Sequence, residues 1–223
     1  MATPSSVSST DKLTAFYYDA LDFVERNRTL VIGIAAAIVL GIAGIFFWGQ
    51  YKSGQEGTAA EDLRKVMPLY QAGTFDKAIA GDSTGVVGLK KIADQYSGTP
   101  SGNMAAVYLG NSYFQKNEID NALKAFKSVS SSSDLISAAA LAGEAACYEQ
   151  KKDFKSAANA YRSAAGRISN AALAPVYLTD AARNFELAGD KDEAVKQLEK
   201  LKKDYPQASQ ARTADQSIVR LKS

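Results

Sequence analysis

Residues that could do chemistry are scarce in this chain. Histidine is absent and a single cysteine, Cys147, is present. The absence of histidine removes Ser–His and Cys–His nucleophiles and the commonest metal ligand. A reactive thiol needs cationic neighbours that lower its pKa, and Ala146 and Tyr148 flank Cys147 instead. We therefore expect Cys147 to be a small core residue, and no internal disulfide can form.

Two polar clusters contain residue types that can bind a ligand, but their spacing does not fit a known ligand-binding motif. Asp190, Asp192 and Glu193 gather at one turn, but a calcium loop needs a longer, regular series of oxygen ligands. Helix capping is their expected role. The run GDSTG at 81–85 lacks the lysine and the spacing of a phosphate-binding loop, so it is predicted to be a turn. The sequence thus predicts no catalytic residue, no metal site and no cofactor, and it disfavours an enzyme.

The element around which the chain is organised is the apolar stretch 29–51, which contains no charged residue. At about 1.5 Å per residue, a helix of this length spans a hydrocarbon core of about 30 Å. Trp48 and Tyr51 stand at its C-terminal edge, as expected for a membrane–water interface. A buried core helix and a signal peptide are the alternatives. The length and lack of charge disfavour the first, and the acidic residues among the preceding 28 disfavour the second.

Residues 1–28 are predicted to be a polar tail followed by an amphipathic helix. One apolar stripe at helical spacing comprises Leu13, Phe16, Tyr17, Ala20, Leu21 and Val24. Arg26 and Arg28 precede the apolar stretch, while Lys52 follows it alone. This bias favours a cytoplasmic N-terminus and a C-terminal domain outside the cytoplasm.

Small residues recur every four positions within the apolar stretch, at Gly33, Ala37 and Gly41. This spacing lets a second membrane helix approach closely. A span that packs on nothing is the alternative. Residues 52–58 are expected to form a flexible linker, and residues 59–223 a single helical domain.

Three helix pairs repeat in that domain with matching residue sizes. Ala122, Ala157 and Ala194 mark equivalent positions of the second helices, at steps of 35 and 37 residues, close to the period of about 34 of a tetratricopeptide pair. The small residues where two helices cross are predicted to be Gly110, Ala145, Ala182, Ala122, Ala157 and Ala194. The bulky residues that fill the space toward the next pair are predicted to be Tyr113, Tyr148, Phe185, Phe126, Tyr161 and Leu198.

A divergent unit precedes the three pairs, and a helix follows them. Tyr70 is expected in its first helix and residues 89–100 in its second, separated by a surface loop at 73–85. Residues 209–222 are expected to form a closing helix. The predicted fold is all-α: an N-terminal amphipathic helix, one transmembrane helix, and an α-solenoid of tetratricopeptide helix pairs with a C-terminal capping helix.

The first helices of such an array line its inner surface. Positions not needed for packing there form a candidate protein-binding groove, comprising Val107, Asn111, Phe114, Glu149, Thr179, Arg183 and Glu186. Asn111 and Arg183 could hold a peptide backbone or a carboxylate. A solvated inner face without a ligand is the alternative. The charge balance, 26 basic against 24 acidic residues, indicates no nucleic-acid partner.

The segment 89–129, LKKIADQYSGTPSGNMAAVYLGNSYFQKNEIDNALKAFKSV, resembles bacterial tetratricopeptide-repeat proteins. The whole layout resembles the ancillary SecYEG translocon subunit family, particularly its membrane-anchored members of Bacteroidota and Chlorobi type. The resemblance implies a single-pass inner-membrane protein with a periplasmic repeat domain that binds chaperones or emerging chains at the export channel. It carries over no residue-level site. The other function considered is a structural subunit that tethers a larger inner-membrane complex through the span and the N-terminal helix.

Overall fold

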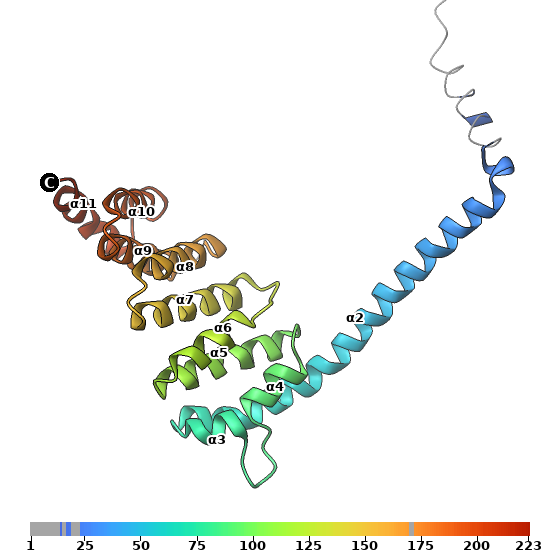
Figure 1. Ribbon diagram of the computed structural model, residues 1–223, viewed down its shortest axis with the longest axis horizontal. Coiled ribbons are helices and arrows are strands. Elements are labelled where there is room, and N and C mark those ends of the chain that lie inside the picture. Colours follow the sequence, from blue (N-terminus) through green and yellow to red (C-terminus); the bar gives the residue numbers. More distant parts are fainter. Residues whose placement is uncertain (1–13, 15–16, 19–22, 170–171) are drawn as a thin grey trace, which may run out of the picture. The chain divides into compact units, whose positions relative to one another are not determined.

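The computed structural model describes residues 14, 17–18, 23–169 and 172–223. Within these residues the chain forms helices and loops, with one isolated bridge between Gly81 and Val87. It divides into two compact units, Met1–Lys52 and Ser53–Ser223 (Figure 1). The predicted all-α class is confirmed for the described part of the chain.

The first unit contains the apolar part of helix α2 (Arg28–Gln71). Its large side chains are exposed, as shown by Leu40 at 72% and Ile45 at 76%. By length and composition this helix could cross a membrane, and its exposure argues against a soluble core helix. Of the expected amphipathic helix, Tyr17, Tyr18 and residues 23–26 are helical. The stripe residues that lie outside the described part are Leu13, Phe16, Ala20 and Leu21.

Residues 52–58, expected to be a flexible linker, are helical and belong to α2. Each glycine costs a helix only about 1 kcal/mol relative to alanine, so Gly54 and Gly57 do not interrupt it. Contacts within the second unit add support. Glu56 accepts hydrogen bonds from the backbone N–H (3.0 Å) and hydroxyl (2.6 Å) of Ser101, and Ala59 is fully buried. The expectation is therefore corrected: the repeat body begins with the helix itself.

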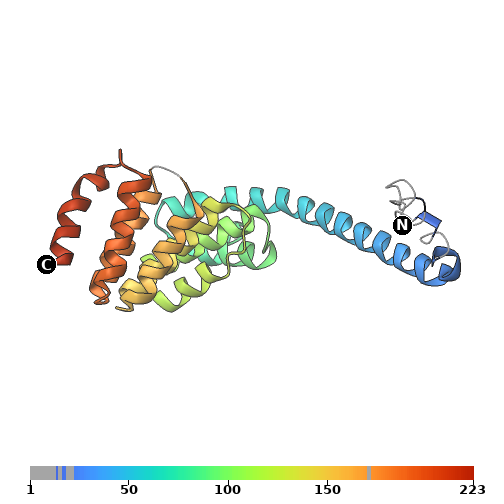
Figure 2. The ribbon, with the colours of Figure 1, turned by 90° about the horizontal axis from the view of Figure 1, so that it is seen from above.

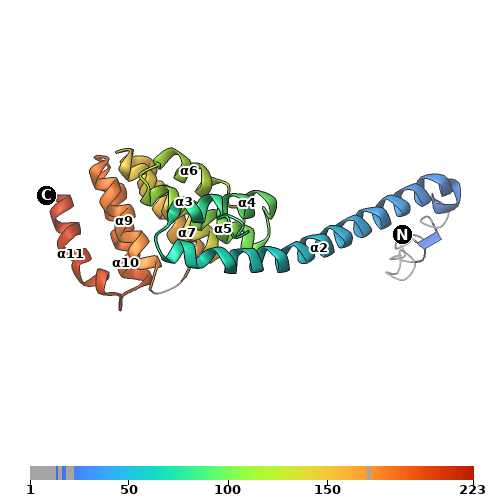
Figure 3. The same ribbon diagram turned by 90° about the horizontal axis from the view of Figure 1, so that it is seen from below.

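The second unit continues α2 and adds a stack of helices in chain order (Figures 1 and 3). They are α3 (Phe75–Ala80), α4 (Leu89–Gln95), α5 (Pro100–Gln115), α6 (Ile119–Lys127), α7 (Asp134–Gln150), α8 (Phe154–Arg167), α9 (Ala174–Leu187), α10 (Lys191–Asp204) and α11 (Ser209–Lys222). We call α2 from Ser53, α5, α7, α9 and the closing α11 the first helices, and α3–α4, α6, α8 and α10 the second helices.

Four turns of the same geometry join first to second helices. Their left-handed residues are Gly73, Asn117, Lys152 and Gly189, with φ of 70, 60, 59 and 81°. In each turn the next residue donates its N–H to a carbonyl five residues back, which ends the first helix and starts the second. The α2–α3 turn is thus a genuine fourth repeat turn.

The first repeat contains an insertion inside its second helix. From Gly73 to Asn117 is 44 residues, against 35 from Asn117 to Lys152. The excess corresponds to a loop at 81–88 that separates α3 from α4, whereas residues 75–80 of the expected surface loop form α3. A Cβ on Gly88 would lie 2.4 Å from the backbone of Ala80 and Gly81. The chain therefore leaves and re-enters the helix through a contact that only glycine fits.

The core follows the predicted pattern of small and bulky residues. Ala122, Ala145, Ala157 and Ala194 are fully buried. Phe126, 2% exposed, lies between Gly110 of α5 and Gly143 of α7, where added Cβ atoms would come within 2.6 and 2.4 Å of its ring. This ring joins one pair to the next.

Helix α11 occupies the predicted closing position, with Ala211, Ala214 and Leu221 buried against α9 and α10. Figure 2 shows it as the last layer of the stack. The capping prediction is confirmed.

Candidate protein-binding face of the first helices

Three of the seven predicted groove residues lie on α5, and they differ in burial. Val107 is 7% exposed and belongs to a core cluster with Ala122 and Phe126. This corrects the expectation for Val107, because its side chain points toward α6 and α7 rather than outward. Phe114 is half-buried and packs on the same cluster, and Asn111 is half-buried.

An aromatic cluster lies beside Asn111, where Tyr70 of α2 meets Tyr108 of α5. The ring centroid of Tyr70 lies 4.8 Å from that of Tyr108 and 6.0 Å from that of Phe75. Burial raises the pKa of Tyr70, and a hydrogen bond with Asn111 partly offsets that rise. Tyr108 and Phe75 were not predicted, although Tyr108 lies three residues before Asn111 and therefore on the same helix face.

A polar cluster, comprising Glu149, Tyr161, Asp180, Arg183 and Asn184, joins α7, α8 and α9. Arg183 Nη2 lies 2.6 Å from Glu149 Oε1 and 3.1 Å from Asp180 Oδ1. The Tyr161 hydroxyl donates to Glu149 Oε2 at 3.3 Å, and the Asn184 amide donates to Glu149. The structure thus brings the predicted Glu149 and Arg183 together, one repeat apart in sequence.

Burial dominates the electrostatics of this polar cluster. It raises the pKa of the Asp180 carboxyl despite the opposing Arg183 guanidinium, and it raises the pKa of Tyr161. Asn184 is fully buried, and its Oδ1 has no hydrogen-bond partner within the described part of the chain. The cluster is therefore largely occupied in holding α7 against α9. Arg183, with its side chain 50% exposed, keeps an accessible edge.

Thr179, Arg183 and Glu186 line a cleft of about 160 Å³ between α9, α10 and α11. Arg220 of α11 also lines it and donates two hydrogen bonds to Glu186, one of 2.9 Å. The Arg220 guanidinium holds the pKa of Glu186 below its usual range. Arg220 was not predicted; its distance of 34 residues from Glu186 is the repeat period, and that signal could have found it.

The other residues singled out from the sequence have structural roles. Cys147 is fully buried, and burial raises the pKa of its thiol to about 11, so it is a core residue as predicted. Asp190 accepts a hydrogen bond from the Glu193 N–H and caps α10. Asp82 accepts from Thr84 and Val86 inside the loop 81–88. The GDSTG turn is therefore ordered by its own side chains.

The predicted helix-packing face of the apolar segment is open. Gly33, Ala37 and Gly41 are exposed, and a Cβ added at either glycine would meet no atom within 4 Å in the described chain. The four-residue spacing places the three on one side of α2. Packing against another membrane helix stays a prediction.

Comparison with known proteins accords with this architecture. The chain matches the tetratricopeptide repeat-like domain family over residues 22–143 and the tetratricopeptide repeat family over residues 178–208. The first match covers more than half of the chain and includes the apolar segment 29–51. No curated protein matches the chain. With four equivalent turns, alternating helix pairs and a closing helix, the chain belongs to the tetratricopeptide repeat-like domain family.

Proposed function

We propose that this chain is a scaffold for protein–protein interaction, the role that its tetratricopeptide repeats support. We propose that it is a single-pass protein of a bacterial inner membrane, with a cytoplasmic N-terminus and a periplasmic repeat domain. We propose further that it acts as an accessory factor for protein export, recruiting chaperones or emerging chains at the translocon.

The observation that carries the proposed role is how closely the repeat body follows the apolar segment, which by length and composition could cross a membrane. Glu56 is hydrogen-bonded to Ser101 of α5, and it lies only five positions after Tyr51, with four residues between them. Even a fully extended chain of that length reaches only about 18 Å. If Tyr51 lies at the membrane–water interface, the first repeat is therefore held at the membrane surface. This position suits a factor that meets chains emerging from a membrane channel.

Binding is proposed for the first-helix face, meaning the accessible surface of Asn111, Phe114, Thr179, Arg183 and Glu186. It offers an amide, an aromatic ring, a hydroxyl and both charge signs, as the peptide backbone and polar side chains of a partner require. Its internal hydrogen bonds hold these groups in place before a partner arrives. Preorganisation of this kind lowers the entropic cost of binding.

A structural tethering subunit of a larger inner-membrane complex is the second candidate. The open face of Gly33, Ala37 and Gly41 favours it, because small residues at this spacing suit close packing with a membrane helix of another subunit.

Site-specific photocrosslinking in intact cells tests these proposals. A photoreactive amino acid at Asn111 or Thr179 samples the first-helix face, one at Gly41 samples the membrane face, and one at Lys152, in an exposed turn, is the control. Export-channel subunits, periplasmic chaperones or exported chains crosslinked from the first-helix positions support the accessory role. Crosslinks from Gly41 alone to a bioenergetic or envelope complex support the tether. Equal crosslinking from Lys152 would contradict a specific first-helix face.

Thiol labelling tests the topology. In a Cys147→Ala background, Ser83→Cys places a thiol in the exposed part of the loop 81–88. A membrane-impermeant reagent is expected to label it in intact spheroplasts. Labelling only after lysis would place the repeat domain in the cytoplasm and contradict the export proposal.

A further inference from the structure

The second-helix side of the first two repeats carries two adjoining clefts. One, of about 470 Å³, is lined by residues of α3 and α4, and the other, of about 200 Å³, lies between α4, α5 and α6. Lys90 and Asp94 line both. Together they form the α4–α6 cleft, on the opposite side of the helix pairs from the first-helix face.

The rim of the α4–α6 cleft is basic. Lys90, Lys91 and Lys124 line it, with Asp94 as the acidic residue. The ammonium group of none of the three lysines forms an ion pair or a hydrogen bond within the described part of the chain. By contrast, Lys116, Lys151 and Lys155 each pair with a carboxylate. The cations around the cleft are thus available to a partner.

The floor of the cleft is apolar. Leu109 and Tyr113 of α5 form it together with Ala93 and Ala125, and Ile79 and Ala80 extend it toward the loop 81–88. A volume of about 200 Å³ between helices accommodates one or two aliphatic side chains but no folded surface. The site therefore combines apolar and charged recognition in a narrow strip.

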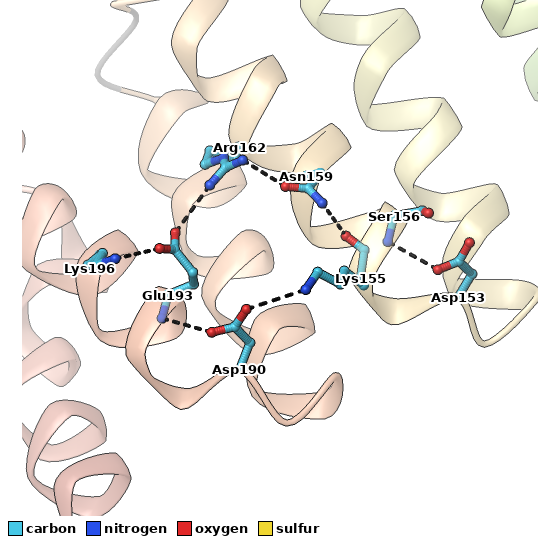
Figure 4. A network of polar contacts seen from close by, with 8 residues as sticks. All are labelled: Asp153, Lys155, Ser156, Asn159, Arg162, Asp190, Glu193 and Lys196. Atoms are coloured by element: carbon cyan, nitrogen blue, oxygen red, sulfur yellow. Dashed lines mark hydrogen bonds and ion pairs between the residues drawn. The ribbon is translucent and has the colours of Figure 1, made fainter.

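At the equivalent junction two repeats later, ion pairs link the two second helices. Between α8 and α10, Arg162 Nη1 lies 3.1 Å from Glu193 Oε2, and Lys155 Nζ lies 3.8 Å from Asp190 Oδ2 (Figure 4). Arg162 also donates to Asn159 at 2.7 Å. At that junction the second helices supply acidic partners to the cations. At the α4–α6 cleft, a partner molecule would have to supply them.

We propose that the α4–α6 cleft docks an acidic, amphipathic segment of a partner protein. Carboxylates of the segment pair with Lys90, Lys91 and Lys124, and its apolar side chains cover Leu109 and Tyr113. The apolar floor favours a polypeptide over a lipid headgroup, which has no apolar group to place there. This surface goes beyond the proposed function: it is separate from the first-helix face and does not depend on what that face binds.

Fluorescence anisotropy with the full-length chain in phosphatidylcholine nanodiscs tests the proposal. The probe is a fluorescein-labelled 16-residue helical peptide of Glu, Leu and Ala, compared with the same peptide carrying Gln for Glu. We expect saturable binding of the Glu peptide that weakens with salt and binding about tenfold weaker for the Gln peptide.

Two triple variants with the same change in net charge locate the site. Lys90→Glu with Lys91→Glu and Lys124→Glu should weaken binding about tenfold or more, because three attractive contacts become repulsive. Lys152→Glu with Lys191→Glu and Lys203→Glu alters exposed lysines that do not line the cleft and should change affinity less than about twofold. Circular dichroism confirms that both variants remain helical.

Three results would overturn the proposal. They are no binding of the Glu peptide, equal loss in both triple variants, and cleft-dependent binding to phosphatidylglycerol vesicles without peptide binding. The last would assign the lysines to an anionic membrane surface. None of these results bears on crosslinking from Asn111 or Thr179, so the two proposals fail separately.

Discussion

The α8–α10 and α4–α6 junctions hold corresponding places in the stack but use charge differently. At α8–α10, Arg162 and Lys155 bind carboxylates of the next repeat. At α4–α6, Lys90 and Lys124 border a cleft without ion pairs in the described chain. Buried residues of the core nevertheless lie beneath both junctions. The contrast indicates that the packing of buried aromatic rings and alanines holds the stack together. Surface charges can therefore join repeats at α8–α10 and remain available for a partner at α4–α6.

The largest expected effect comes from the two fully buried rings of the stack, Phe126 between α5 and α7 and Phe185 between α8 and α10. Phe126 and Phe185 are 2% and 1% exposed. Replacing either with alanine should lower the free energy of unfolding by about 3–5 kcal/mol, because each leaves a cavity in a close-packed core. Urea denaturation followed by circular dichroism at 222 nm measures both. A loss below about 1 kcal/mol for either variant would contradict a packing-held stack.

A smaller loss is expected at the insertion that distinguishes the first repeat. In Gly88→Ala the new Cβ would lie 2.4 Å from backbone atoms of residues 79–81, and such overpacking costs about 1–3 kcal/mol. Gly85→Ala is a partial control, because its Cβ would meet nothing within 4 Å although its φ of 92° is also strained. The same denaturation experiment should therefore rank Gly88→Ala as the more destabilised. The reverse order would contradict the close approach.

Removing one cation from each junction tests directly whether charge stabilises α8–α10 and not α4–α6. Arg162→Ala removes contacts with Glu193, Asn159 and the Phe185 ring, whose centroid lies 5.3 Å from the guanidinium carbon. Its melting temperature should fall by about 2–4 °C. Lys124→Ala removes no such contact and should leave the melting temperature within about 1 °C. Equal falls would mean that both junctions are stabilised by charge.

The smallest expected effect is on the melting temperature at acidic pH. Arg220 lowers the pKa of Glu186, and a carboxyl with a lowered folded-state pKa stabilises the fold above its unfolded value of about 4.3. That contribution is lost as the pH falls through the folded-state pKa. Glu186→Gln should therefore melt below the wild type at pH 7, and this deficit should shrink as the pH falls below about 4.3. A Glu186→Gln deficit that does not shrink with falling pH would contradict the ion-pair explanation.

The repeat pattern predicted the three regular pairs and α11 because residue size and period agreed there. The α2–α3 turn at Gly73 was missed because the inserted loop 81–88 shifts the first repeat out of period. Val107 was misplaced because a period of 35–37 residues fixes which helix lines a face but not its rotation to within one residue. The lysines of the cleft were not singled out, since only the structure shows which charges lack partners.

Membrane attachment is the claim on which the account of function depends. It is tested most directly by fractionating cells that express the full-length chain or a variant lacking residues 29–51. The full-length chain should remain in the membrane pellet after alkaline carbonate extraction and dissolve only in detergent. The deletion variant should be soluble and retain its helical signal. Release of the full-length chain by carbonate would contradict a membrane-spanning segment.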